Sequence, residues 1–147
     1  MNKSSADILL VEDSEDDTAL FVHALAESHP STQIQIAQDG VEALVMIYGL
    51  GQPESSPPII RPKLIILDLK MPKISGLEVL RILKSNPNTL SIPVVALSSS
   101  QEKFDLAESY RLGVNSYLVK PMDFDKFKVA VKILISYWLA YNKPSKQ

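Results

Sequence analysis

The sequence predicts an α/β fold in which five parallel strands form one doubly wound sheet with helices on both faces. Short apolar runs such as Ile8–Val11 have the length of strands, and an unbroken apolar run is typical of a parallel strand buried on both faces. Segments with helical spacing of apolar residues alternate with these runs, which favours repeated strand–helix–strand units. The 147 residues are enough for one domain with a substantial core.

The expected strands, in chain order, are Ile8–Val11, Gln33–Ile36, Lys63–Leu67, Pro93–Leu97 and Ser116–Val119. The second of them alternates polar and apolar side chains, which indicates a half-exposed strand at or near an edge of the sheet. Pro93 is compatible with the fourth strand because it is the first residue, where a missing N–H donor is tolerated.

The expected helices begin near Ser14, Asp39, Ser75, Gln101 and Asp123 and end near Glu27, Leu50, Lys84, Leu112 and Tyr141. Ser14 is a typical N-cap residue, and the acids that follow it suit the positive end of a helix. Gly113 is expected to end the fourth helix in a left-handed conformation. Gly51–Pro62 contains four prolines and is expected to form a long surface loop.

Composition excludes several classes of protein. The formal net charge of −2 argues against a nucleic-acid partner, because no basic stripe is present to neutralise phosphates. Without cysteine, the chain forms neither disulfides nor thiolate metal sites. Its polar start, Met1–Ser5, does not resemble a signal peptide, and no segment approaches transmembrane length. We therefore expect a cytoplasmic protein that does not bind membranes.

Carboxylates stand at the carboxyl ends of two apolar runs. Glu12 and Asp13 follow the first strand, and Asp68 follows the third. In open parallel sheets, ligands bind outside these strand ends. If the two strands are neighbours, three carboxylates converge and repel one another unless a cation is present, and such oxygen ligands favour Mg²⁺. The sequence therefore predicts a metal site with a carboxylate nucleophile, although strand-end acids can also be solvated caps.

Four motifs in this order, each at the end of a predicted strand, resemble the receiver domain of two-component response regulators. They are Ile8–Asp13, Leu67–Pro72 with Ser75–Gly76, Val95–Ser99 and Tyr117–Pro121. The resemblance covers about residues 7–135 of a single domain that spans 1–147, and 136–147 form a helix extension and tail. It implies a flavodoxin-like three-layer sandwich with strand order 2-1-3-4-5, which makes the first and third strands neighbours.

The resemblance also implies roles for the site residues. Asp68 would be the phosphoacceptor that attacks a phosphohistidine of a partner kinase and forms an acyl phosphate. Mg²⁺, or Mn²⁺ or Ca²⁺ in its place, would bind Asp13, Asp68 and the backbone carbonyl of Lys70, with Glu12 acting through water. Lys120 would pair with the carboxylate before phosphoryl transfer and with a phosphoryl oxygen after it.

Two further residues are implied to form the switch. The Ser98 hydroxyl would bind the phosphoryl group, and Tyr117 would swing inward as Ser98 moves, which would change the face built by helix 4, strand 5 and helix 5. A strand tyrosine can also be simple packing. The Lys120–Pro121 bond is expected to be cis, because tight turns of this type are where cis proline is kept.

The chain is therefore expected to be a single-domain response regulator and not an enzyme that turns over a small substrate. Its Gly51–Pro62 loop, together with the segment from Phe127 to Leu139, most resembles regulators paired with cyanobacterial phytochrome-type histidine kinases. The expected partners are such a kinase and a downstream phosphotransfer or other signalling protein.

The sequence argues against four rivals. A flavin binder would need a phosphate loop where Glu12–Glu15 stands, and acids there repel phosphate. A haloacid-dehalogenase-type phosphatase would have a second acid at position 70, and the chain has Lys70. No P-loop motif occurs. A receiver that cannot be phosphorylated would lack an acid or Lys120, and here none is missing.

The last helix is expected to carry a surplus apolar face. One stripe suffices to dock it on the sheet: Phe127, Val131, Leu134, Trp138 and Tyr141. Other apolar residues lie off that stripe, and surplus apolar surface marks a protein contact, here a homodimer. The expected contact residues are Phe127, Ile133, Ile135, Trp138 and Leu139. In the alternative, these residues fold back under the tail or lie singly exposed.

Overall fold

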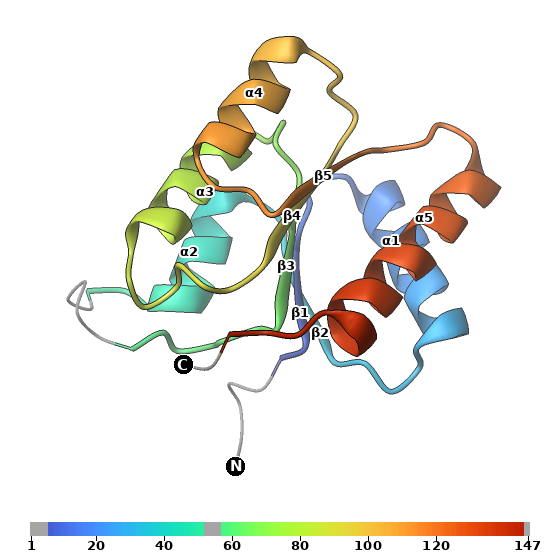
Figure 1. The fold of residues 1–147 in the computed structure, drawn as a ribbon, viewed down its shortest axis with the longest axis horizontal. Coiled ribbons are helices and arrows are strands. Elements are labelled where there is room, and N and C mark those ends of the chain that lie inside the picture. The colour runs from blue at the N-terminus through green and yellow to red at the C-terminus, as the bar shows by residue number, and fades with distance from the viewer. Residues whose placement is uncertain (1–5, 52–56, 146–147) are drawn as a thin grey trace.

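A parallel sheet between two layers of helices forms the body of the protein (Figure 1). The structure, a computed structural model, describes residues 6–51 and 57–145. Within these residues the strands are β1 (Ile8–Val11), β2 (Ile34–Ala37), β3 (Leu64–Leu67), β4 (Val94–Ser98) and β5 (Ser116–Val119). They pair in parallel in the order β2-β1-β3-β4-β5. The predicted fold class and strand order are confirmed.

The helices alternate with the strands along the chain. They are α1 (Glu15–Ser28), α2 (Gly40–Tyr48), α3 (Gly76–Ser85), α4 (Lys103–Arg111) and α5 (Phe124–Ser136), which continues into the π-helical turn η1 (Tyr137–Tyr141). Helices α1 and α5 cover one face of the sheet, and α2, α3 and α4 cover the other (Figure 1). Among the described residues, no helix is both long enough and apolar enough to cross a membrane.

Alternation along each buried strand divides the core into two clusters. Leu9 and Val11 of β1 belong to the cluster on the α2–α4 face, whereas Ile8 and Leu10 belong to the cluster under α1 and α5. Strands β3 and β4 divide in the same way, because successive side chains of a strand point to opposite faces of the sheet. Strand β2 lies at the edge and is half-buried, as its alternating pattern predicts.

Most predicted boundaries agree with the structure to within two residues, and Gly113 has the expected positive φ of 105°. Helix α2 ends at Tyr48 instead of Leu50 because Gly49, with φ at 79°, turns the chain out of the helix. Residues 52–56 of the predicted loop, and the polar start at 1–5, lie outside the described residues. The rest of the loop is held against the body, since the Ile59 N–H donates to the Ile47 carbonyl and Ile60 is buried.

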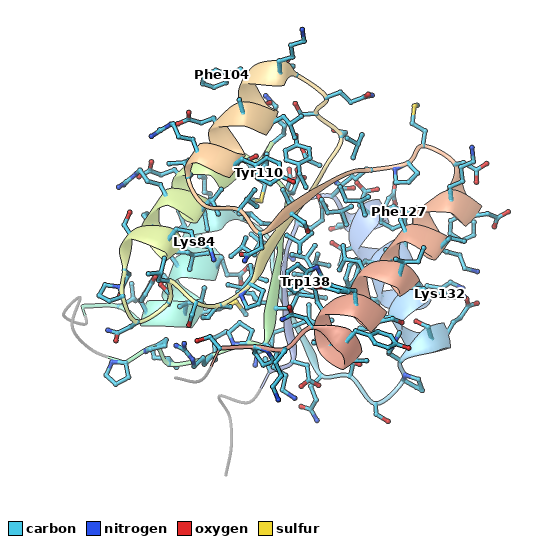
Figure 2. All side chains as sticks on the ribbon, viewed as in Figure 1. Lys84, Phe104, Tyr110, Phe127, Lys132 and Trp138 are labelled. Atoms are coloured by element: carbon cyan, nitrogen blue, oxygen red, sulfur yellow. The ribbon has the colours of Figure 1, made fainter. Side chains whose placement is uncertain are left out.

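The C-terminal helix differs from the predicted single stripe. Figure 2 labels Phe127 and Trp138, which pack toward the sheet as expected, but Tyr141 is 78% exposed. Ile135 was expected off the stripe and is fully buried. The reason is that the core-facing surface of a helix is about 100° wide, so it includes Ile135, which lies one turn after Val131. Phe127 and Ile135 are thus unavailable for a contact with another chain, and their assignment to the dimer face is wrong.

Gly76, the first residue of α3, packs closely against the backbone that follows β3, and this close packing can be tested. A Cβ added to Gly76 would lie 2.2 Å from the Asp68 carbonyl oxygen and 2.5 Å from the Leu69 Cα. Because these are backbone atoms that cannot turn aside, we expect Gly76→Ala to lower the free energy of unfolding by about 3 kcal/mol, measured by urea unfolding.

Gly51→Ala is the matched control, since a Cβ there would meet no atom of the described residues within 4 Å and, among them, only the positive φ of 71° opposes it. That strain is worth about 1 kcal/mol. An equal decrease in the free energy of unfolding in the two variants would show that the close packing of Gly76 against the backbone after β3 does not contribute to stability.

Candidate functional site

The strand pairing brings the predicted acids together. Val11 of β1 pairs directly with Leu67 of β3, and the Asp68 N–H donates to the Val11 carbonyl at 3.0 Å. Glu12 and Asp68 therefore leave the sheet side by side, each one residue past the paired ends. Carboxylate oxygens of Glu12, Asp13 and Asp68 lie within 4.8 Å of one another, which is the convergence that the sequence predicts.

Backbone donors orient two of these carboxylates. The Ser14 N–H donates to Oε2 of Glu12, and the Lys70 N–H donates to Oδ1 of Asp68, each at 3.1 Å. Glu12 and Asp68 are only 3% and 6% exposed, whereas Asp13 is exposed. Each buried carboxylate is thus fixed by a backbone donor through one oxygen, and its other oxygen faces the ammonium of Lys120.

Lys120 lies at the centre of the acids. Its Nζ is 2.7 Å from Oε1 of Glu12, 2.7 Å from Oδ2 of Asp17 and 3.5 Å from Oδ2 of Asp68. The Lys120 N–H donates to the Ser98 carbonyl at 2.9 Å, which continues the pairing of β4 and β5 and aims the side chain at the acids. The sequence indicated Lys120 but not Asp17, which seemed to serve only the N-terminus of α1.

Burial and pairing shift two of these groups. Burial raises the pKa of Glu12 to about 7, although the hydrogen bond from Lys120 opposes this shift. Burial by itself would lower the pKa of Lys120, but the hydrogen bonds to Asp17 and Glu12 outweigh it and raise that pKa above its ordinary value. Lys120 therefore stays charged at neutral pH, while the charge of Glu12 is sensitive to pH.

The donor set fits a divalent cation. Carboxylates outnumber ammonium groups in the cluster around Lys120, so the cluster has a surplus of negative charge that a cation would relieve. The three grouped carboxylates offer hard oxygen ligands, which Mg²⁺, Mn²⁺ and Ca²⁺ bind in preference to nitrogen or sulfur. Because Asp13 is exposed, a hydrated ion can reach them.

Ser98, the last residue of β4, and Tyr117 of β5 both form a hydrogen bond with Ser100, in the segment that follows β4. The fully buried Ser98 accepts at Oγ from the Ser100 N–H at 3.2 Å. The half-buried Tyr117 donates its hydroxyl hydrogen to the Ser100 carbonyl at 2.8 Å. The two predicted switch residues therefore contact the same residue, Ser100, from opposite sides.

Asp105 connects this segment to the loop after β3. Its Oδ2 lies 3.0 Å from the Lys70 Nζ and accepts from the Ser100 hydroxyl at 2.6 Å. Asp105 is a buried acid in the first turn of α4. Sequence reasoning missed it, because an acid in a first turn is ordinary helix chemistry. The contact with Lys70 joins two residues 35 positions apart in the sequence, so only the folded structure reveals it.

The Lys120–Pro121 peptide bond is trans, since the described residues contain no cis bond, and the prediction of a cis bond is wrong. The prediction assumed a tight turn. From Lys120 to Asp123 the chain instead runs without a hydrogen-bonded turn into the N-cap of α5. Nothing there offsets the preference of about 0.5–1 kcal/mol for the trans isomer.

The chain is similar to known proteins over most of its length. Residues 8–132 match the response regulator receiver domain. The chain belongs to this family. The response regulator Rcp1 of Synechocystis sp. is 43% identical over 133 residues, which are 90% of this chain and 88% of Rcp1. The protein is thus a receiver domain of a two-component response regulator, over nearly its whole length.

Two solved structures resemble this receiver along the chain. The Mn²⁺-bound form of Rcp1 is 39% identical with a TM-score of 0.83, and covers 95% of this chain and 98% of its own. The phosphorylated cyanobacterial phytochrome response regulator RcpA is 36% identical with a TM-score of 0.86, and covers 97% of this chain and 99% of its own. Close relatives have thus been observed with a divalent metal and in a phosphorylated state.

The raised pKa of Glu12 predicts how metal binding depends on pH. As the pH falls through about 7, Glu12 takes up a proton and the cluster loses one negative charge. We expect the affinity for Mg²⁺ to fall about threefold to tenfold between about pH 8 and pH 6, measured by isothermal titration calorimetry.

Glu12→Gln is the control for this pH dependence, because it is neutral throughout and nearly isosteric. It should bind Mg²⁺ more weakly at the higher pH, with a flatter dependence across the range. An equally steep dependence in this variant would assign the proton to another group.

Proposed function

We propose that this receiver accepts a phosphoryl group from a sensor histidine kinase onto Asp68, with Mg²⁺ bound, and signals by protein contact. The observation that supports this most directly is the position of Asp68. One of its oxygens is held by the Lys70 N–H, and the other is 3.5 Å from the ammonium of Lys120. The Asp68 carboxylate is therefore oriented by a backbone donor, and its long contact with the Lys120 ammonium leaves an oxygen able to attack an incoming phosphorus atom.

The transfer forms one bond and breaks another. A carboxylate oxygen of Asp68 attacks phosphorus, and the bond from phosphorus to the imidazole nitrogen of the kinase breaks, which leaves an acyl phosphate on Asp68. A bound Mg²⁺, held by Asp13, Asp68 and the Lys70 carbonyl with Glu12 in support, would supply positive charge between the two anions. The rest of the site positions the reacting groups.

Lys120 and Ser98 are the proposed partners of the transferred phosphoryl group. Lys120 has a buried, permanently charged ammonium that exchanges a carboxylate oxygen for a phosphoryl oxygen. Ser98 offers its hydroxyl hydrogen, because its Oγ acts as an acceptor toward the Ser100 N–H and leaves the O–H free to turn. Neither step requires a small-molecule substrate, so we propose a signalling protein without further turnover.

The proposed output is the face formed by α4, β5 and α5. A movement of Ser98 toward the phosphoryl group would pull on Ser100, whose carbonyl holds Tyr117 and whose hydroxyl holds Asp105. The signal therefore has a continuous hydrogen-bonded route from the strand end to two elements of this face. Exposed apolar side chains on it, such as Phe104 on the outer side of α4 (Figure 2), offer contact surface for a partner.

The proposed kinase partner is of the phytochrome type, and a downstream phosphotransfer protein would receive the signal. The likeness to RcpA, a cyanobacterial phytochrome response regulator, and to Rcp1 supports this class of partner.

We also propose a homodimer through α5. Val129, Ile133 and Tyr137 are spaced one turn apart and are 55%, 64% and 49% exposed. They line a groove of about 610 Å³ between α5 and the edge strand β5. A row of apolar residues along one helix can pack against its own copy about a two-fold axis.

Phosphorylation tests the first proposal. Incubation with acetyl phosphate and Mg²⁺ should add one phosphoryl group per chain, measured by mass spectrometry of the intact protein. Asp68→Asn should take up none, and EDTA should abolish the reaction in the wild type, because the acids would then repel the incoming phosphate. Uptake by Asp68→Asn at the wild-type rate would refute the assignment of Asp68.

Sedimentation velocity at micromolar concentration tests the homodimer. Ile133→Glu places a charge in the exposed apolar row, so it should convert dimers into monomers. Val41→Glu, at a position 40% exposed on α2, which covers the opposite face of the sheet from α5, is the matched control and should leave the dimer intact. A wild-type protein that stays monomeric with and without phosphorylation would refute the proposed homodimer.

A further inference from the structure

Asp17 has a contact that its place in the helix does not explain. It is the third residue of α1, where an acid commonly reaches back to the N-cap N–H in a capping box. Here that donor, the Ser14 N–H, is already bound to Glu12. The carboxylate of Asp17 instead lies 2.7 Å from the Nζ of Lys120, so it belongs to the acceptor site and not to the helix end.

The distances show how Lys120 is divided among the acids. Its contacts with Glu12 and Asp17 are 2.7 Å each, while its distance to Asp68 is 3.5 Å, the limit of a hydrogen bond. An ammonium held at two short contacts moves toward a third anion only by lengthening one of them. Asp17 thus draws Lys120 away from the nucleophile in the unphosphorylated protein.

Of the three acids, Asp17 is the one that can release Lys120 most easily. Its side chain is 34% exposed, whereas those of Glu12 and Asp68 are 3% and 7% exposed. A half-exposed carboxylate regains water when it loses its partner, but a buried one is left uncompensated. When a phosphoryl group arrives, the contact between Asp17 and Lys120 is therefore the one that breaks.

We propose that Asp17 is a positioning residue that restrains phosphorylation by holding Lys120 toward α1 until a phosphoryl group competes for it. The proposal rests on the proposed function of Asp68. Asp17 touches neither the reacting atoms nor the metal ligands in this account and acts through Lys120. The effect of Asp17 on phosphorylation therefore depends on the presence of the Lys120 ammonium.

The experiment compares Asp17→Asn with Asp16→Asn. Both remove one negative charge from the first turn of α1, but Asp16 is exposed and makes no ion pair among the described residues. We expect Asp17→Asn to raise the initial rate of phosphorylation by acetyl phosphate and Mg²⁺ about threefold, the size of a half-exposed ion pair, and Asp16→Asn to leave it unchanged.

Three further measurements separate positioning from a structural role. Asp17→Glu, which keeps the carboxylate, should restore the wild-type rate. In a Lys120→Met background, Asp17→Asn should no longer change the residual rate. The side-chain NMR signal of the Lys120 ammonium should shift in unphosphorylated Asp17→Asn but not in Asp16→Asn. If Asp17→Asn lowers the melting temperature, Asp17→Ser serves for the same comparison.

Equal rates in the wild type and Asp17→Asn, or equal acceleration by both charge removals, would overturn this inference and leave the role of Asp68 intact. A wild type that accepts no phosphoryl group at all would overturn both. The two failures are thus distinguishable.

Discussion

The site depends on the attraction between the Lys120 ammonium and the carboxylates that surround it. Glu12 and Asp68 are buried, and buried charges without a partner are costly. Lys120, itself only 10% exposed, compensates them from the far end of the chain. Because β5 is an edge strand, the Lys120 side chain comes from the edge of the sheet, and the site forms only when β1, β3, β4 and β5 have paired.

The charges of this cluster are not fully balanced by its own residues. A fully satisfied network would hold its members in place, but here Asp68 has the longest contact with Lys120 and Asp13 is exposed. A bound cation would relieve the surplus of negative charge, so the folded acid cluster fits a divalent metal before any metal is present.

The sequence predicted the parts of this site that follow from strand ends. Each strand is a short apolar run followed by its functional residue, so Glu12, Asp68 and Lys120 were placed by local pattern and strand order together. Asp17 and Asp105 were missed because both stand in the first turn of a helix, where an acid already has an ordinary explanation. The ion pairs of Asp17 with Lys120 and of Asp105 with Lys70 are tertiary contacts, which a local sequence pattern does not reveal. Ile135 was wrongly assigned to the exposed face because the buried face of a helix is wider than one stripe of residues. The trans bond before Pro121 depends on how the chain enters α5.

The alternation that divides the core into two clusters has a consequence for how this protein varies. Substitutions under α1 and α5 fall in a different core cluster from substitutions under α2, α3 and α4, so their effects on stability should be largely additive. The α1 and α5 layer can therefore accumulate changes that suit a new partner while the opposite layer keeps its own packing. The acid cluster lies at the carboxyl ends of β1 and β3, between the two layers, and a lineage of such proteins can diversify its recognition surfaces one face at a time without changing these acids.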